Sequence, residues 1–222
     1  MTSWPRFAET PFKKIKVPQE LYVEMMLAYN KARFNEIQYD AYFDDDYQMI
    51  VSGGSVSILN SNNPFYLRAS IPRHIFNKWG EQLQPLLEEW SGTELRFIQG
   101  YGIRSYVKDS ILAVHRDEIK THIISAIIHI DEYPDVKWPL DFLDHEGQHH
   151  QVTFDPGDML MYESLCVHAR ETPFVGEFYR NMYFHWCPAD WNPTPYQNNR
   201  LRYTSIEEAK SEYQFNTIRR TN

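Results

Sequence analysis

The sequence has little cysteine, little clustered positive charge and no long hydrophobic run, and each shortage argues against a class of protein. Its two cysteines, Cys166 and Cys187, form no disulfide framework, which favours a reduced, cytoplasmic protein. The net charge of -8 argues against a nucleic-acid binder, because phosphate neutralisation needs clustered Lys and Arg. No stretch approaches about 18 apolar residues and the start lacks the pattern of a signal peptide, so no membrane segment is expected.

Aromatic and β-branched residues are plentiful, and their spacing predicts a mainly β protein. Aromatics make up 15% of the 222 residues, a length that suits one large domain. From residue 93 onward, short runs of these residues alternate with turn signals such as "DPGD", a pattern typical of a sandwich or barrel. Strands are expected at 94–100, 103–107, 111–115, 122–131, 138–143, 149–154, 158–162, 166–170 and 178–187.

The first 92 residues predict a helical layer that supports this β region. Helices are expected there at 18–37 and 72–90, and a third helix is expected in the tail at 206–214. The second helix should be strained or broken near Pro85, and Gly92 should end it. Residues 1–17 are expected to be irregular, and 37–68 to be loop with short strands.

Two copies of a His-x-Asp pattern lie close together in the stretch "SILAVHRDEIKTHIISAIIHIDEYP". They are His115-Arg-Asp117 and His129-Ile-Asp131. Residues two apart on a strand point to one face, so either pair could offer an imidazole and a carboxylate to a metal ion. With a second histidine, either would form the two-His, one-carboxylate triad of non-haem Fe(II) oxygenases.

The choice of the third ligand separates the two pairs. His168 follows a turn and an apolar strand that should carry it towards the core. In a double-stranded β-helix the distal histidine lies four strands after the His-x-Asp pair, and four expected strands separate Asp117 from His168. Only three separate Asp131 from it, so His115 and Asp117 are favoured and His129 is more simply a polar residue on a buried strand. The other candidate histidines are His145, His149, His150 and His185.

An arginine shares a strand face with apolar residues in "EFYRNMYFHW". Arg180 alternates with Phe178, Met182, Phe184 and Trp186. A buried guanidinium needs an anionic partner. That partner is either an aspartate of the same chain or the carboxylate of a ligand, which guanidinium can hold with two parallel hydrogen bonds.

Residues 93–188 resemble the catalytic core of the 2-oxoglutarate- and Fe(II)-dependent dioxygenases, in particular the prolyl 4-hydroxylase type. The resemblance rests on "YVKDSILAVHRD", "THIISAIIHID", "TFDPGDMLMYESLCVHAR" and "GEFYRNMYFHW". It implies a single domain, 1–222, whose double-stranded β-helix (jelly-roll) core at 93–188 follows a helical and loop layer at 1–92 and precedes a tail at 189–222.

The resemblance also implies a site. Fe(II) would be held by His115, Asp117 and His168. The cosubstrate 2-oxoglutarate would contact Arg180, through its distal carboxylate, and Tyr106 and Ser125, although ordinary strand packing explains the last two equally well. The chain departs from the family in the longer gap between His168 and Arg180, and in "KWPLDF", which replaces a family Gly-Gly-Glu.

The implied activity is hydroxylation of an unactivated C–H bond, using O₂ and 2-oxoglutarate, with ascorbate as a candidate reductant. The first expected substrate is a prolyl residue in a peptide or protein, or free proline. Three alternatives stay open: a small-molecule hydroxylase of the same family, a non-catalytic β-barrel that binds a metal or carboxylate, and a Zn hydrolase. No nucleic-acid or membrane partner is expected, and the sequence does not fix the oligomeric state.

Overall fold

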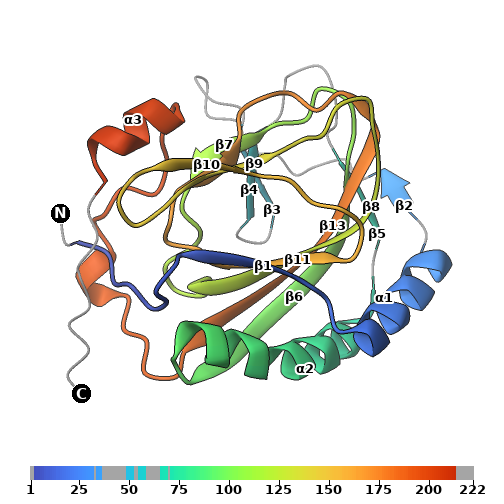
Figure 1. The fold of residues 1–222 in the computed structure, drawn as a ribbon, viewed down its shortest axis with the longest axis horizontal. Coiled ribbons are helices and arrows are strands. Elements are labelled where there is room, and N and C mark those ends of the chain that lie inside the picture. Colours follow the sequence, from blue (N-terminus) through green and yellow to red (C-terminus); the bar gives the residue numbers. More distant parts are fainter. Residues whose placement is uncertain are drawn as a thin grey trace.

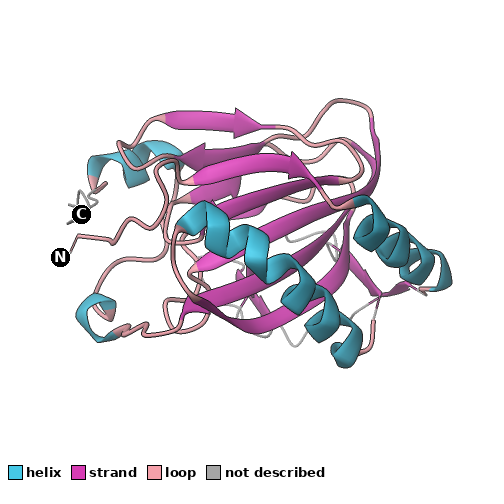
Figure 2. Cartoon of the chain, turned by 60° about the horizontal axis from the view of Figure 1, so that its bottom comes forward, coloured by secondary structure: helices cyan, strands magenta, loops and turns pink. Residues whose placement is uncertain are grey.

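The computed structural model describes residues 3–32, 34–36, 49–52, 55–58, 66–69 and 71–213. Two antiparallel sheets face each other, and two helices cover the outer face of the larger sheet (Figures 1 and 2). Among the described residues, no helix is both long and apolar enough to cross a membrane.

The elements occupy the following residues, with the labels of Figure 1. The helices are α1 (Gln19–Lys31), α2 (Arg73–Ser91) and α3 (Ile206–Ser211), with a 3-10 turn at Thr194–Tyr196. The first strands are β1 (Phe12–Lys16), β2 (Phe34–Glu36), β3 (Met49–Ser52), β4 (Ser55–Ile58) and β5 (Tyr66–Ala69). The later strands are β6 (Leu95–Tyr106), β7 (Leu112–His115), β8 (Ile124–Pro134), β9 (Leu140–Leu143), β10 (His149–Val152), β11 (Asp158–Glu163), β12 (His168–Arg170) and β13 (Gly176–Pro188).

Eight strands from β6 to β13 form the jelly roll. The larger sheet has the order β1-β11-β8-β13-β6-β5-β2 and the smaller one β10-β9-β12-β7. The chain therefore crosses repeatedly between β6, β8, β11 and β13 on one side and β7, β9, β10 and β12 on the other. This is the arrangement of a double-stranded β-helix, and the predicted fold class is confirmed.

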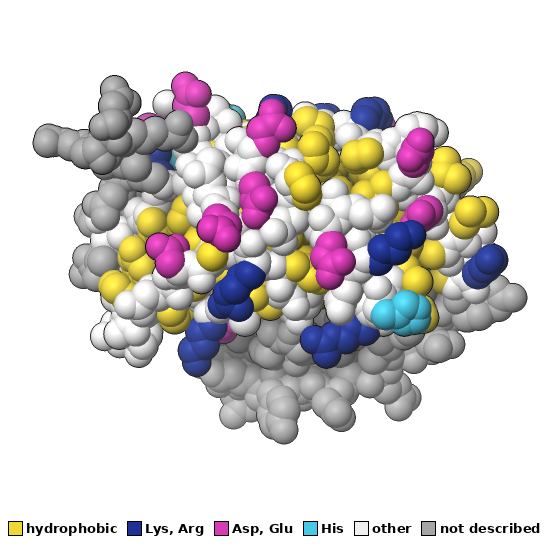
Figure 3. Space-filling model, turned by 90° about the horizontal axis from the view of Figure 1, so that it is seen from below, with side chains coloured by type: hydrophobic (Ala, Val, Ile, Leu, Met, Phe, Trp, Pro, Cys, Tyr) yellow, Lys and Arg dark blue, Asp and Glu magenta, His cyan; other side chains and the backbone are white. Residues whose placement is uncertain are grey.

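Helices α1 and α2 bury one face of the larger sheet. Their apolar stripes include Met25, Trp79 and Leu83, which pack on sheet residues such as Ile128 and Phe184. The outer surface of this helical layer carries acidic and basic side chains interspersed with apolar atoms (Figure 3). The layer is therefore an ordinary amphipathic cover, apolar towards the sheet and charged towards water.

The predicted end of α2 is confirmed, and the predicted break within it is wrong. Gly92 takes the left-handed conformation, with φ of 65°, and its N–H bonds to the carbonyl of Glu88 at 2.8 Å. The helix runs on through Pro85. Pro85 is exposed, and burial of Leu83 and Leu87 on the opposite face offsets the hydrogen bond that proline removes.

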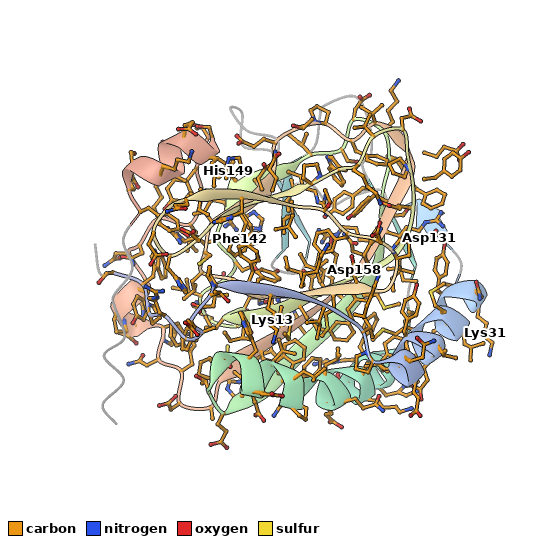
Figure 4. All side chains as sticks on the ribbon, in the orientation of Figure 1. Lys13, Lys31, Asp131, Phe142, His149 and Asp158 are labelled. Atoms are coloured by element: carbon orange, nitrogen blue, oxygen red, sulfur yellow. The ribbon has the colours of Figure 1, made fainter. Side chains whose placement is uncertain are left out.

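The second face of the larger sheet looks into the barrel. Aromatic rings fill much of this space, including Tyr106, Phe142, Tyr162 and Tyr183. Figure 4 shows Phe142 between the two sheets, where its ring meets that of Phe12 at 4.9 Å. The two largest parts of the core thus lie under the helices and inside the barrel.

Two sequence expectations about strands need correction. The expected strands at 94–100 and 103–107 are one strand, β6. The expected irregular region at 1–17 contains β1, whose three lysines hid its pairing with β11 along one edge. Much of 37–68 lies outside the described residues.

Candidate metal centre

Three side chains meet at one end of the barrel. His115 ends β7, His168 begins β12, and the two are paired across the smaller sheet. Asp117 lies two residues beyond β7, and its carboxylate lies near both imidazoles. Its Oδ1 lies 3.3 Å from Nε2 of His115 and 3.7 Å from Nε2 of His168, and one ligand atom of each residue falls within 4.8 Å of the others.

The hydrogen bonds of the two imidazoles fix where their lone pairs point. Nδ1 of His115 lies 2.7 Å from the carbonyl of Ala113, and Nδ1 of His168 lies 3.0 Å from the carbonyl of Cys166. A carbonyl can only accept, so each Nδ1 carries the proton and each Nε2 turns a lone pair towards the carboxylate. Three electron-rich atoms facing one another repel unless a cation lies between them, so the donor set fits a divalent metal.

Burial and charge keep Asp117 and His168 in their metal-ligating forms. Burial raises the pKa of Asp117, but His168 and His115 beside it offset this and hold that pKa well below its ordinary value. Burial and the neighbouring His115 lower the pKa of His168 to about 4. Near neutral pH, Asp117 is therefore a carboxylate and His168 a neutral imidazole, the forms that bind a metal.

Tyr162 on β11 is a neighbour of this cluster that the sequence did not single out. Its hydroxyl donates to Oδ2 of Asp117 at 3.3 Å, which leaves Oδ1 for the two histidines. Burial and Asp117 raise the pKa of Tyr162 well above its ordinary value, so it remains a donor. One hydroxyl thus orients the carboxylate.

A bulge in β8 separates the residues of the second His-x-Asp pair. Arg180 pairs with Asp131 and Asn181 with His129, so Ile130 is an extra residue on β8. The alternation of β8 side chains between the two faces of the sheet therefore shifts by one residue at this point. His129 faces the barrel interior, where it stacks on a tyrosine ring, whereas Asp131 accepts a hydrogen bond from Tyr29 of α1 (Figure 4).

Arg180 does not face the barrel. Its side chain lies on the helix-covered side of β13, where Nη1 is 3.5 Å from Oδ2 of Asp131 and donates to the hydroxyl of Tyr29. Its guanidinium also lies over the ring of Phe178. This position corrects the expectation of a cosubstrate contact and agrees with the alternative, in which an aspartate of the same chain is the partner.

Tyr106 and Ser125 do lie in the interior. The hydroxyl of Tyr106 accepts from Nη1 of Arg104 at 3.2 Å and lies 3.0 Å from the hydroxyl of Tyr183. Oγ of Ser125 lies 2.6 Å from Nδ1 of His185. Burial lowers the pKa of His185 and the negative charge of Asp117 acts to raise it, so His185 lies near the cluster. Both predicted positions are therefore buried on the interior face of the larger sheet.

Arg104 is an interior cation that the sequence reading missed. It is buried, and its guanidinium lies over the rings of Tyr101, Tyr106 and Tyr183. Tyr101 in turn stacks on His185, which connects Arg104 to the metal end of the barrel. A signal was present, because Arg104 precedes Tyr106 by two residues in a predicted strand and so shares its face.

Comparison with known proteins supports the fold through structure alone. No family model matches the sequence, and no curated protein matches it. Solved structures do match. HygX from Streptomyces hygroscopicus was solved with nickel, 2-oxoglutarate and hygromycin B bound. It matches with a TM-score of 0.54 and 12% sequence identity, and the alignment covers 92% of this chain and 95% of HygX.

Two further structures agree. AviO1 from Streptomyces viridochromogenes has a TM-score of 0.55 at 11% identity, with 85% of this chain and 94% of its own covered. An oxidoreductase of the 2OG-Fe(II) oxygenase family from Burkholderia pseudomallei has a TM-score of 0.52 at 11% identity, with 79% and 84% covered. The chain has the fold of these three structures, one of them from the 2OG-Fe(II) oxygenase family, and the resemblance predicted from the sequence is confirmed at the level of the fold.

Proposed function

We propose that this protein is an Fe(II)- and 2-oxoglutarate-dependent dioxygenase that hydroxylates an unactivated C–H bond. The observation that carries the proposal is the cluster of His115, Asp117 and His168 at one end of the barrel, with both Nε2 atoms directed at one carboxylate oxygen. Bound Fe(II) would supply the chemistry that couples oxidative decarboxylation of 2-oxoglutarate by O₂ to hydroxylation of the substrate.

The residues of the chain have distinct tasks in this proposal. The carbonyls of Ala113 and Cys166 hold the imidazole tautomers, and Tyr162 holds the carboxylate. The buried rings of Phe142 and Tyr162 lie close to His168 and exclude water from that side of the site. A dry, fixed surrounding strengthens the electrostatic contacts made in it.

For the distal carboxylate of 2-oxoglutarate we assign Arg104 in place of Arg180. Support comes from its buried position on the interior face, its hydrogen bond to Tyr106 and its connection through Tyr101 to the metal end. A guanidinium held among three tyrosine rings is fixed in place, and it can meet a carboxylate with two parallel hydrogen bonds. Tyr106, with its hydroxyl between Arg104 and Tyr183, is assigned as a second contact.

The substrate class is the finer part of the proposal. The sequence resemblance makes a prolyl residue, or free proline, the first class to test. A small-molecule substrate is the second, since HygX, a match across nearly the whole chain, was solved with hygromycin B bound. Both classes fit the same metal cluster and the same cosubstrate residues.

The direct test is anaerobic mixing of the protein with Fe(II) and 2-oxoglutarate. The expected result is a weak visible charge-transfer band that requires both additions and is lost in His168→Ala. In air with ascorbate, candidate substrates should then stimulate succinate formation and gain one oxygen by mass. Absence of the band, and of succinate with every substrate, would favour a non-catalytic β-barrel. A band-free protein that hydrolyses substrates with Zn(II) would favour the hydrolase.

A further inference from the structure

A short segment near the C-terminus lies against the strand that carries the first histidine of the cluster. Arg202 is the β-bridge partner of His115. The bridge is held on both sides, because the N–H of Arg116 bonds to the carbonyl of Leu201 at 2.9 Å and that of Tyr203 to the carbonyl of Val114 at 3.1 Å. The segment therefore behaves as an added strand at the edge of β7, directly beside the metal cluster.

The guanidinium of Arg202 uses only part of its hydrogen-bonding capacity. Nη1 donates to the carbonyls of Arg116 at 2.6 Å and Leu201 at 3.0 Å. In the described part of the chain, Nε and Nη2 have no acceptor and no carboxylate lies within ion-pair distance. Arg200, two residues earlier, differs because Glu208 and Glu212 bind it at 2.7 and 3.1 Å.

Two carboxylates, those of Asp117 and Glu118, act on the charge of Arg202, but neither forms an ion pair with it in the described part of the chain. Burial lowers its pKa, while Asp117 and Glu118 act in the opposite direction, and an arginine remains charged in either case. Asp117 forms no ion pair with Arg202; its Oδ1 faces the two histidines and its Oδ2 accepts from Tyr162. A partly buried cation beside the cluster, with Nε and Nη2 both available to donate, is a site suited to an oxyanion.

We propose that Arg202 binds an anionic oxygen group of the substrate, a carboxylate or a phosphate, next to the metal. This inference rests on the proposed function and narrows it. Arg104 lies on β6 of the larger sheet and is assigned to the cosubstrate, whereas Arg202 lies beside β7 at the edge of the smaller sheet. The substrate is therefore an acid, and free proline or a chain-terminal proline is preferred over a prolyl residue inside a polypeptide.

The test measures anion binding near the metal and needs no known substrate. The full chain is loaded with Mn(II), which is paramagnetic, and saturated with 2-oxoglutarate, and binding of both is first measured by calorimetry. Carboxyl-¹³C acetate and inorganic phosphate are then titrated in separate arms, and the broadening of their ¹³C and ³¹P resonances is recorded. We expect saturable broadening in the wild type, and the arm with the stronger effect identifies the preferred anion.

Three variants separate a binding role from a structural one. Arg202→Gln should lower the saturable broadening at least fivefold, and Arg202→Lys, which keeps the charge, should lower it less. Lys120→Gln removes an exposed positive charge from the neighbouring loop and should retain the broadening. If Arg202→Gln does not fold, the comparison of Arg202→Lys with Lys120→Gln still decides the matter.

The outcomes that overturn each proposal differ. Equal broadening in wild type and Arg202 variants, or broadening that disappears when 2-oxoglutarate is added, refutes the role of Arg202. No saturable broadening with Mn(II) and 2-oxoglutarate bound also refutes that role and leaves the proposed function intact. Failure of the wild type to bind Mn(II) and 2-oxoglutarate together refutes the proposed function itself.

Discussion

Exchanging the roles of Arg104 and Arg180 leads to a sharp prediction about cosubstrate affinity. Arg104→Gln removes a buried guanidinium assigned to the distal carboxylate of 2-oxoglutarate. Hydrogen bonds to charged groups contribute roughly 1.5–3 kcal/mol each, so the loss of about 3 kcal/mol should weaken 2-oxoglutarate binding about 100-fold. Fe(II) affinity should change little, because Tyr101 and His185 lie between Arg104 and the cluster.

Arg180→Gln is the matched control for this prediction. It removes the same charge from the helix-covered face, where the side chains of Arg180 and Asp131 are 17% and 35% exposed. The ion pair contributes on the order of 1 kcal/mol, and Arg180 also donates to Tyr29 and Ser105, so the thermal midpoint should fall while the Kd for 2-oxoglutarate stays within about twofold. The assay is titration of the anaerobic charge-transfer band with 2-oxoglutarate. A loss of affinity in Arg180→Gln as large as that in Arg104→Gln would refute the assignment.

Three further predictions concern the cluster itself. Asp117→Ala should bind Fe(II) at least tenfold more weakly and form no succinate, and full turnover by this variant would contradict the metal assignment. Tyr162→Phe loses one hydrogen bond to Oδ2 of Asp117, worth about 1 kcal/mol, so Fe(II) binding should weaken about fivefold in calorimetry, and unchanged binding would contradict this orienting role. His168 has a folded pKa of about 4 against an ordinary 6.5, so its stabilising contribution is full above pH 6.5 and is lost as pH falls towards 4. Urea unfolding of the metal-free protein should show this loss, on the order of 3 kcal/mol, in the wild type and not in His168→Ala, and identical pH profiles would exclude it.

The alternation along β13 was readable from the sequence, but the side that faces the site was not. Arg180 shares its face with Met182 and Phe184, an apolar set that suggested the interior. In the structure this face packs under α1 and α2, whereas Asn181, Tyr183 and His185 look into the barrel. The interior of a catalytic barrel needs polar groups, so the more apolar face of a strand is the one that a helix covers.

The convergence of His115, Asp117 and His168 was predictable because it depends on strand order, which survives errors in strand boundaries. Joining two expected strands into β6 did not change the count from Asp117 to His168. Arg202 was out of reach of the same logic, because its bridge to His115 joins the tail to an edge strand. No local pattern in "NNRLRYTS" indicates such a long-range pairing.

The extra residue in β8, Ile130, determines which of the following side chains on that strand face the barrel. Ahead of it, His129 faces the barrel; after it, Asp131 faces α1 and Glu132 comes back to lie 3.3 Å from His129. One unpaired residue thus places His129 and Asp131 on opposite faces of the sheet, although this pair has the same His-x-Asp spacing as His115 and Asp117. Deletion of Ile130 should therefore remove the bulge and leave Asp131 and Glu132 on their present faces, because the residues paired with Asn181 and Arg180 would then be consecutive on β8.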